Sequence, residues 1–342
     1  MFLARQFSSI TKRAAMTHSK PKVFVTRIIP PGAQKLLEEQ HNVHIEQWKD
    51  AKRIPREILL EKVRGVDGIL CMLTDKIDKE LCDAAGPQLK VISTMSVGYD
   101  HVCLQDLADR NIKLGYTPDV LTDATADITA MLALAAGRRM KESMQAIVSG
   151  EWGNWTPTWL LGLQFTGKTL GIFGLGRIGH AVGIRLRAFG IKKIIYCGPR
   201  PKPDLAAAID AKYVSEDELL KESDVVCVTC SLNEKTSGYF NYERFKKMKR
   251  EAIFVNTSRG GIVVQDDLER ALRENIIFAA GLDVCTPEPL PPNSSLLSLP
   301  NCTLLPHIGS ATLETRNEMG RVAVENVIAG VLDKELLHEV KL

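Results

Sequence analysis

The 342-residue chain lacks several features that would assign it to a specialised class. No uninterrupted apolar run approaches the ~20 residues of a membrane-spanning helix, so we expect no membrane insertion. No block of Lys or Arg suggests a nucleic-acid surface, and the net charge is only +3. The 8 cysteines lie mainly in apolar, strand-like runs, which favours reduced core residues over a disulfide framework. The length favours two globular domains of ordinary composition.

Acidic residues are also missing from the first 20 positions, which contain Arg5, Lys12, Arg13 and Lys20 among serines and bulky apolar side chains. This composition is typical of a mitochondrial transit peptide, and it predicts a mitochondrial protein. A disordered tail, or translation from Met16, would instead leave the protein in the cytoplasm.

Short apolar runs alternate with amphipathic ones from Lys22 onward. Such alternation predicts βαβ units and parallel sheets. A first set of strands is expected at 22–26, 43–48, 68–73, 89–95 and 112–116. A second set is expected at 169–173, 193–197, 224–229, 252–256, 278–282 and 302–305. A final helix follows Ser310.

The proline-free segment 121–150, rich in Ala and Leu, separates the two sets. It predicts one helix of about 25 residues, roughly 37 Å long, at the junction of the domains. The next segment, "EWGNWTPTWLLG", holds Trp152, Trp155 and Trp159. Such a cluster favours either a subunit interface or a hydrophobic clasp within the chain.

A glycine motif follows the strand expected at 169–173. Gly174, Gly176 and Gly179 form GxGxxG between this apolar strand and an amphipathic helix, which is the context of a dinucleotide-binding turn. Phosphates are expected to face the amides of Arg177 and Ile178 at the helix N-terminus.

The acid that usually binds the cofactor ribose is missing after the next strand. The sequence there has Gly198, Arg200 and Lys202, and the first acid is Asp204. An acid would repel a 2′-phosphate, whereas a guanidinium can bind one in bidentate fashion. The loop therefore predicts NADPH as the preferred cofactor, with NADH as a weaker alternative. A solvated basic loop with mixed cofactor use is the other interpretation.

Polar residues follow three later strands of the same set: Arg259, then Asp283 and Glu288, then His307. In open α/β sheets, ligands bind outside the carboxyl ends of the strands. An Arg, a Glu and a His delivered to this edge could act together on one substrate.

Four motifs, "GLGRIG", "NTSRGG", "GLDV..PEPLP" and "LPHIGSAT", occur in one order. With them the chain, from Lys22 onward, resembles the D-isomer-specific 2-hydroxyacid dehydrogenases. "STMSVGYDHV" and "GYTPDVLTDATAD" are most similar to the glyoxylate/hydroxypyruvate reductases of animals. The resemblance implies two Rossmann-like or flavodoxin-like parallel-sheet domains. A substrate domain at 21–121 and 313–342 would contain the inserted NAD(P)-binding domain at 122–312.

The resemblance also implies roles for residues. His307 would be the proton donor and acceptor, Glu288 its partner, and Arg259 the substrate anchor. Cofactor contacts are expected from Gly174, Gly176, Arg177, Ile178, Gly179, Gly198, Arg200, Lys202, Thr125, Ser231, Thr257, Asp283 and Gly309. Substrate contacts are expected from Leu73, Val97, Gly98, Arg259, His307, Ser310 and Trp155, the last reaching into a partner subunit of a homodimer. No metal is expected.

The expected reactions are glyoxylate to glycolate and hydroxypyruvate to D-glycerate. Two alternatives remain open. One is a phosphoglycerate or D-lactate dehydrogenase of the same family, and the other is a non-catalytic NAD-binding scaffold similar to the corepressors of this fold.

Overall fold

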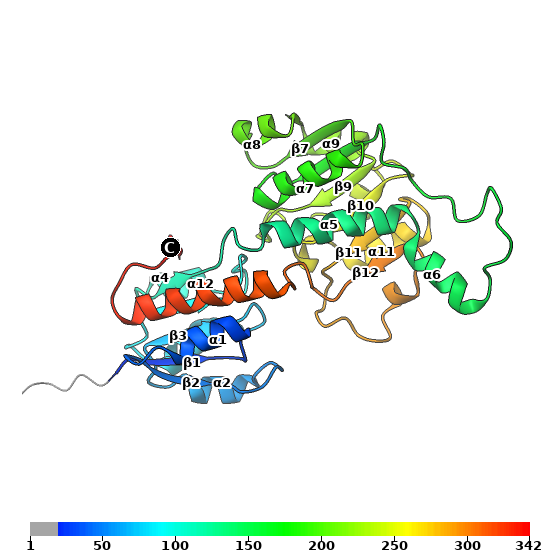
Figure 1. The fold of residues 1–342 in the computed structure, drawn as a ribbon. Coiled ribbons are helices and arrows are strands. Elements are labelled where there is room, and N and C mark those ends of the chain that lie inside the picture. Colours follow the sequence, from blue (N-terminus) through cyan, green and yellow to red (C-terminus); the bar gives the residue numbers. More distant parts are fainter. Residues whose placement is uncertain (1–19) are drawn as a thin grey trace, which may run out of the picture.

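The computed structural model describes residues 20–342, so residues 1–19, which hold nearly all of the predicted transit peptide, lie outside the described part. Two open sheets organise the described residues, one at each end of the molecule (Figure 1). The predicted α/β class is therefore confirmed. Between residues 20 and 342, no helix is both long and apolar enough to span a bilayer.

The first sheet has the strand order β13-β5-β4-β3-β1-β2, in which all neighbours are parallel except β13 and β5. Without β13 this is the flavodoxin-like order 2-1-3-4-5. Its strands are β1 (Lys22–Val25), β2 (His44–Gln47), β3 (Gly68–Cys71), β4 (Val91–Thr94), β5 (Lys113–Gly115) and β13 (Glu339–Val340). Its crossover helices are α1 (Pro31–Glu38), α2 (Arg56–Lys62), α3 (Lys79–Ala85) and α4 (Leu104–Ala108).

The second sheet is entirely parallel and has the order β12-β11-β10-β9-β6-β7-β8. This is the Rossmann order, with its reversal point between β6 and β9. Its strands are β6 (Thr169–Phe173), β7 (Lys193–Cys197), β8 (Ala211–Tyr213), β9 (Val225–Val228), β10 (Ile253–Asn256), β11 (Ala279–Leu282) and β12 (Cys302–Leu304). Its helices are α5 (Thr122–Gly137), α6 (Met140–Ser149), α7 (Arg177–Ala188), α8 (Pro203–Ala208), α9 (Glu216–Glu222), α10 (Tyr242–Phe245) and α11 (Gln265–Arg273). Two 3₁₀ turns lie at Gly260–Ile262 and Ser295–Ser298.

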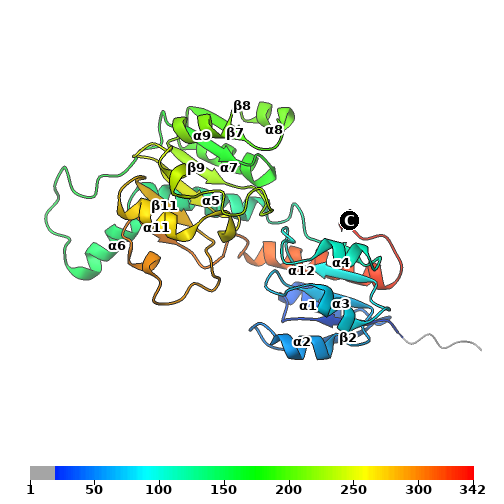
Figure 2. The same cartoon turned by 180° about the vertical axis from the view of Figure 1, so that it is seen from behind.

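Apolar side chains fill both faces of each sheet. On β10, Phe254 points to the cluster beneath α9, α10 and α11, while Ile253 and Val255 point to the cluster beneath α5, α7 and α8. The first sheet is covered by α1 and α12 (Leu313–Val331) on one face and by α2, α3 and α4 on the other (Figures 1 and 2). Each fully buried large apolar side chain contributes about 1.5–3 kcal/mol to folding.

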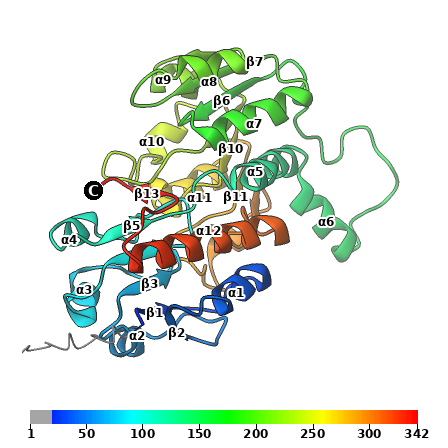
Figure 3. The ribbon, with the colours of Figure 1, turned by 60° about the vertical axis from the view of Figure 1, so that its left-hand side comes forward.

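Helix α12 follows the second sheet in sequence but packs on the first (Figure 3). Glycines allow the close approach. A Cβ at Gly68 of β3 would lie 2.5 Å from Val331 Cγ1, and a Cβ at Gly330 of α12 would lie 2.6 Å from Val91 Cβ. The second sheet is thus inserted into the chain of the first, as predicted. The exact boundaries proposed at 121/122 and 312/313 stay a prediction.

The single helix predicted over 121–150 is wrong. The segment forms α5 and α6, separated by Arg139 in the left-handed region at φ 53°. Where α5 ends, the Gly137 carbonyl oxygen accepts a hydrogen bond of 2.7 Å from the Leu163 amide. Arg139 pairs with Glu142 in the first turn of α6. Helix α5 packs on β10, β11 and α7, so it belongs to the second sheet.

Two strands were not predicted. β8 has 3 residues and β13 has 2. Both lie at sheet edges, and neither contains an apolar run, since β8 reads Ala-Lys-Tyr and β13 reads Glu-Val.

Candidate active site

The glycine turn after β6 shows why each glycine stands where it does. Gly174 has φ 100°, and an added Cβ would lie 2.8 Å from the Cys230 Cα. A Cβ on Gly179 would lie 2.8 Å from both Ile172 Cγ2 and Thr229 Oγ1, so helix α7 packs tightly on the sheet. At Gly176, by contrast, an added Cβ would meet no heavy atom within 4 Å. The open position at the N-terminus of α7 fits a bound pyrophosphate.

The loop after β7 exposes Arg200 to solvent and leaves Lys202 partly exposed. Its backbone is held by tyrosine hydroxyls: Tyr213 donates to the Gly198 carbonyl oxygen at 2.8 Å, and the Lys202 amide donates to Tyr196 at 2.9 Å. Within residues 20–342, the side chains of Arg200 and Lys202 make no hydrogen bond or ion pair with protein groups. Both remain available for a phosphate beside the glycine turn.

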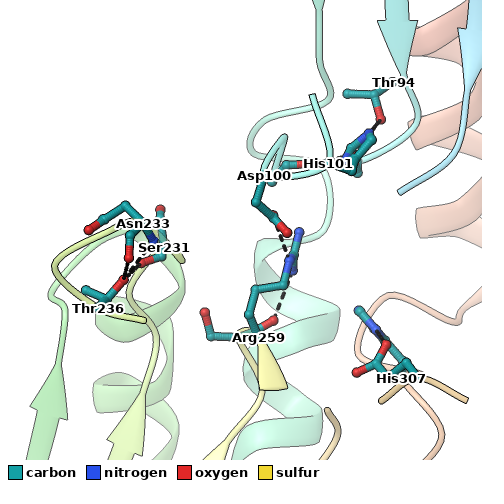
Figure 4. A network of polar contacts seen from close by, with 12 residues as sticks. Thr94, Asp100, His101, Ser231, Asn233, Thr236, Arg259 and His307 are labelled. Atoms are coloured by element: carbon teal, nitrogen blue, oxygen red, sulfur yellow. Dashed lines mark hydrogen bonds and ion pairs between the residues drawn. The ribbon is translucent and has the colours of Figure 1, made fainter. Parts of the chain in front are cut away.

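A cavity of about 460 Å³ lies where the carboxyl ends of strands from both sheets meet. It brings together ten of the predicted site residues besides Arg259 and His307. These are Leu73, Val97, Gly98, Thr125, Ile178, Ser231, Thr257, Asp283, Gly309 and Ser310. In Figure 4, Arg259 appears between the Ser231–Thr236 loop and His307. We call this space the cleft cavity.

His307 is held in a defined orientation. Its Nδ1 lies 2.8 Å from Glu288 Oε2, and its backbone amide donates to the Asp283 carbonyl oxygen at 2.9 Å. The residue has φ 55°, a left-handed conformation that His tolerates better than most residues. Because Nδ1 is engaged, Nε2 is the nitrogen available to a ligand in the cleft cavity.

Glu288 is ionised in this arrangement. Burial disfavours its charge, but the hydrogen bonds with His307 and the Cys285 amide, together with the charges of His307 and Arg259, outweigh burial. They hold the pKa of this carboxyl below its usual value.

Asp283 fixes the loop that carries His307. Its buried carboxylate accepts hydrogen bonds from the amides of Ile308 at 2.8 Å and Gly309 at 2.7 Å. Burial raises the pKa of this carboxyl, against the effect of the two amides. Both carboxylate oxygens of Asp283 therefore already accept backbone hydrogen bonds. The nicotinamide contact predicted for this residue would come in addition to them.

Arg259 is anchored across the two sheets by Asp100, which the sequence analysis missed. The Arg259 Nε donates to Asp100 Oδ1 at 2.9 Å (Figure 4). A Cβ on Gly98 would lie 2.0 Å from Arg259 Nη2, so the guanidinium touches the loop predicted to bind the substrate carboxylate. The position of Asp100 two residues after Gly98 was the only available signal.

A second histidine near the cleft, His101, has a different environment. Burial lowers its pKa to about 4, so it is neutral at physiological pH. Its Nε2 lies 3.0 Å from Thr94 Oγ1. His101 does not line the cleft cavity, whereas His307 does.

Other predicted residues lie outside the cleft cavity. Gly174, Gly176, Gly198, Arg200 and Lys202 belong to the glycine turn and the adjacent loop. The Arg177 side chain pairs with Asp119.

The tryptophan segment does not form a clasp within the chain. Trp155 is 84% exposed, and Trp152 and Trp159 are 65% and 40% exposed. The segment runs from α6 to β6 away from the rest of the molecule (Figure 1). Contact of Trp155 with a partner subunit stays a prediction.

Known proteins share both the sequence and the fold. The family model "D-isomer specific 2-hydroxyacid dehydrogenase, NAD binding domain" matches residues 130–309. Human glyoxylate reductase/hydroxypyruvate reductase is 48% identical over 321 residues, which cover 94% of this chain and 98% of the human protein. A Thermus thermophilus structure has a TM-score of 0.86 at 43% identity and covers 94% of this chain and 100% of its own. An NADPH-dependent glyoxylate/hydroxypyruvate reductase of Sinorhizobium meliloti, solved with NADP and malonate, has a TM-score of 0.79 at 32% identity and covers 94% and 97%.

Proposed function

The chain belongs to the D-isomer specific 2-hydroxyacid dehydrogenase family, and from this premise we propose that it reduces small 2-oxo acids with NADPH. Glyoxylate and hydroxypyruvate are the proposed substrates, and glycolate and D-glycerate the products. The main observation behind this proposal is that Arg259 and His307 line the same cavity and that His307 is hydrogen-bonded to Glu288. The names of the human and S. meliloti relatives support the choice of substrates and cofactor.

The residues divide the chemistry as follows. The substrate carboxylate binds the Arg259 guanidinium and the backbone at Val97 and Gly98. A bound nicotinamide supplies the hydride equivalent to C2 of the substrate. Arg259 stabilises the charge that develops on the carbonyl oxygen, and His307 donates a proton to that oxygen from Nε2. Glu288 keeps the ring oriented through Nδ1 and supports its protonated form.

The pH dependence should reveal the His307–Glu288 pair. Reduction consumes a proton, so it needs protonated His307, and ionised Glu288 favours that form. For Glu288→Gln we expect the alkaline limb of the kcat profile to move to lower pH by about one unit or more, because the opposite charge is lost. Initial rates measured from pH 5 to 9 test this. An unchanged alkaline limb would show that Glu288 does not act through His307.

Cofactor preference should depend on Arg200. For Arg200→Ala we expect the ratio of kcat/KM with NADPH to that with NADH to fall by about tenfold or more, because a charge-assisted hydrogen bond to the 2′-phosphate is lost. Lys202→Ala should give a smaller decrease. Arg250→Ala, at an exposed arginine elsewhere in the second domain, is the control. An unaltered ratio in Arg200→Ala would leave the loop as a solvated turn.

A homodimer is proposed because large apolar side chains are exposed together on α6 and the following segment. Met144, Ile147, Val148, Trp152 and Trp155 are each more than 60% exposed. Such aromatic and apolar groups are typical of the buried centre of an interface.

Steady-state kinetics test the proposed function directly. We expect kcat/KM for glyoxylate and hydroxypyruvate to exceed that for pyruvate and 3-phosphohydroxypyruvate, with NADPH preferred over NADH. A preference for pyruvate would indicate a D-lactate dehydrogenase, and a preference for the phosphorylated acid a phosphoglycerate dehydrogenase. No turnover of any of the four, with intact NADPH binding, would favour the scaffold alternative.

A further inference from the structure

A second and larger cavity is also lined by His307. It measures about 790 Å³ and shares Leu73, Asp283 and His307 with the cleft cavity. Small-molecule sites typically have ~300–1,000 Å³, and a two- or three-carbon acid leaves most of this space unfilled. Because the two cavities share these walls, the side chain of a substrate whose carbonyl lies at His307 would be next to this second space. We call this space the side cavity.

The walls of the side cavity are mostly apolar. They come from the loops after β1, β3 and β4 of the first sheet and from the loops around β12 of the second. The apolar lining residues are Ile28, Pro30, Met72, Leu73, Met95, Pro289, Leu290, Leu297, Leu304, Leu305 and Pro306. Such walls suit a chain of methylene groups.

Two arginines also line this cavity. The first is Arg316, which lies in the first turn of α12. Its guanidinium makes no hydrogen bond or ion pair within residues 20–342. Burial lowers the pKa of this guanidinium, and Asp283 is the acid that acts on it. Both Asp283 oxygens already accept backbone hydrogen bonds. A partly desolvated arginine without a carboxylate partner is costly unless a ligand supplies one.

Arg27 is the second arginine of the side cavity. It donates through Nη2 to Thr74 Oγ1 at 3.0 Å and lies 3.9 Å from Asp75 Oδ1. Its Nε is buried without a hydrogen-bond partner in the described part of the chain. Glu288 is the one carboxylate besides Asp283 that lines the cavity, and it is bound to His307. Arg27 is therefore balanced by Asp75, whereas Arg316 has no such carboxylate among the described residues.

We propose that the side cavity receives the side chain of the substrate and that Arg316, assisted by Arg27, binds a second carboxylate at its end. The enzyme would then accept 2-oxo dicarboxylic acids through the same hydride and proton transfer at C2. This inference rests on the proposed function, because it needs the 2-oxo acid to be oriented by Arg259 and His307. The proposal adds a second anion site, which binds the carboxylate at the far end of a longer substrate.

Three substrates separate the possibilities. 2-Oxoglutarate carries a second carboxylate, 2-oxohexanoate has an uncharged side chain of similar length, and glyoxylate has no side chain. We expect Arg316→Met to lower the ratio of kcat/KM for 2-oxoglutarate to that for 2-oxohexanoate by about tenfold or more, since a charge-assisted hydrogen bond is lost. Glyoxylate should change by less than about twofold. Arg250→Met is the matched control, and Arg316→Lys, which keeps the charge but not the fork, should give an intermediate ratio.

If 2-oxoglutarate is bound but not reduced, competitive inhibition of glyoxylate reduction that Arg316→Met weakens also supports the site. An unchanged ratio in a folded variant, noncompetitive inhibition, or no effect of 2-oxoglutarate on the wild type would overturn it. Melting temperatures identify a variant that fails to fold, and Arg316→Lys then provides the test. Absence of glyoxylate reduction by the wild type would instead contradict the proposed function itself.

Discussion

Replacing His307 by asparagine is expected to lower kcat for glyoxylate reduction by about 10²–10⁴-fold, the usual contribution of a general acid. The proton donor to the carbonyl oxygen is lost, while the left-handed backbone at φ 55° is kept, because Asn tolerates this conformation well. Alanine would remove the same proton donor but would add backbone strain. The asparagine variant therefore separates chemistry from folding more cleanly.

Cofactor binding should be unaffected in His307→Asn. The dissociation constant for NADPH, measured by the change in its fluorescence, is expected to stay within about twofold of the wild-type value, as for a substitution that removes no cofactor contact. The exposed His41 offers the control variant His41→Asn, which should retain full activity. Near-normal turnover by His307→Asn would remove this residue from the mechanism.

Replacing Arg259 by methionine should give the other large effect. We expect kcat/KM for glyoxylate to fall by about 10²–10³-fold, because the loss of one partner from a desolvated charge pair costs 2–5 kcal/mol. KM should rise because the carboxylate loses its anchor, and kcat should fall because charge on the carbonyl oxygen is no longer stabilised. Arg259→Lys should recover only part of the loss, since lysine lacks the planar fork that serves the substrate and Asp100 together.

Asp100 allows a further distinction in the Arg259 experiment. It binds Arg259 Nε at 2.9 Å, so the Asp100→Asn variant keeps the arginine but weakens its orientation. A small loss in Asp100→Asn beside a large loss in Arg259→Met identifies the guanidinium itself as the anchor. Wild-type kcat/KM in a folded Arg259→Met variant would show that the backbone at Val97 and Gly98 suffices for carboxylate binding.

Much of this architecture can be predicted from the sequence. The alternation of apolar and amphipathic runs identified every strand longer than three residues, and the GxGxxG motif marked the turn after β6. These features are local, because strand and helix periodicity and the need for glycine at φ 100° are fixed within a few residues. The motif order also indicated that Arg259, Glu288 and His307 would act together.

The errors came from interactions between distant segments. The break between α5 and α6 coincides with a hydrogen bond from Leu163 to the Gly137 carbonyl oxygen, and the lone Gly137 was a weak local signal that the Ala-rich segment around it outweighed. Asp100 was missed because an acid in a loop is ordinarily solvated, and only the approach of the second sheet makes it the partner of Arg259.

The sequence by itself predicted the α/β class and the glycine turn after β6 from residue type and local spacing, and the family resemblance supplied the residues proposed as proton donor and substrate anchor. Tertiary structure decided the rest. It joined Glu288 to His307 Nδ1 and thereby left Nε2 available, and it brought Asp100 to Arg259. It also placed Arg316 in a mostly apolar cavity where, among the described residues, no carboxylate forms a hydrogen bond or ion pair with its guanidinium. Burial and partner distance depend on how the two sheets meet, and no stretch of the chain specifies that contact alone.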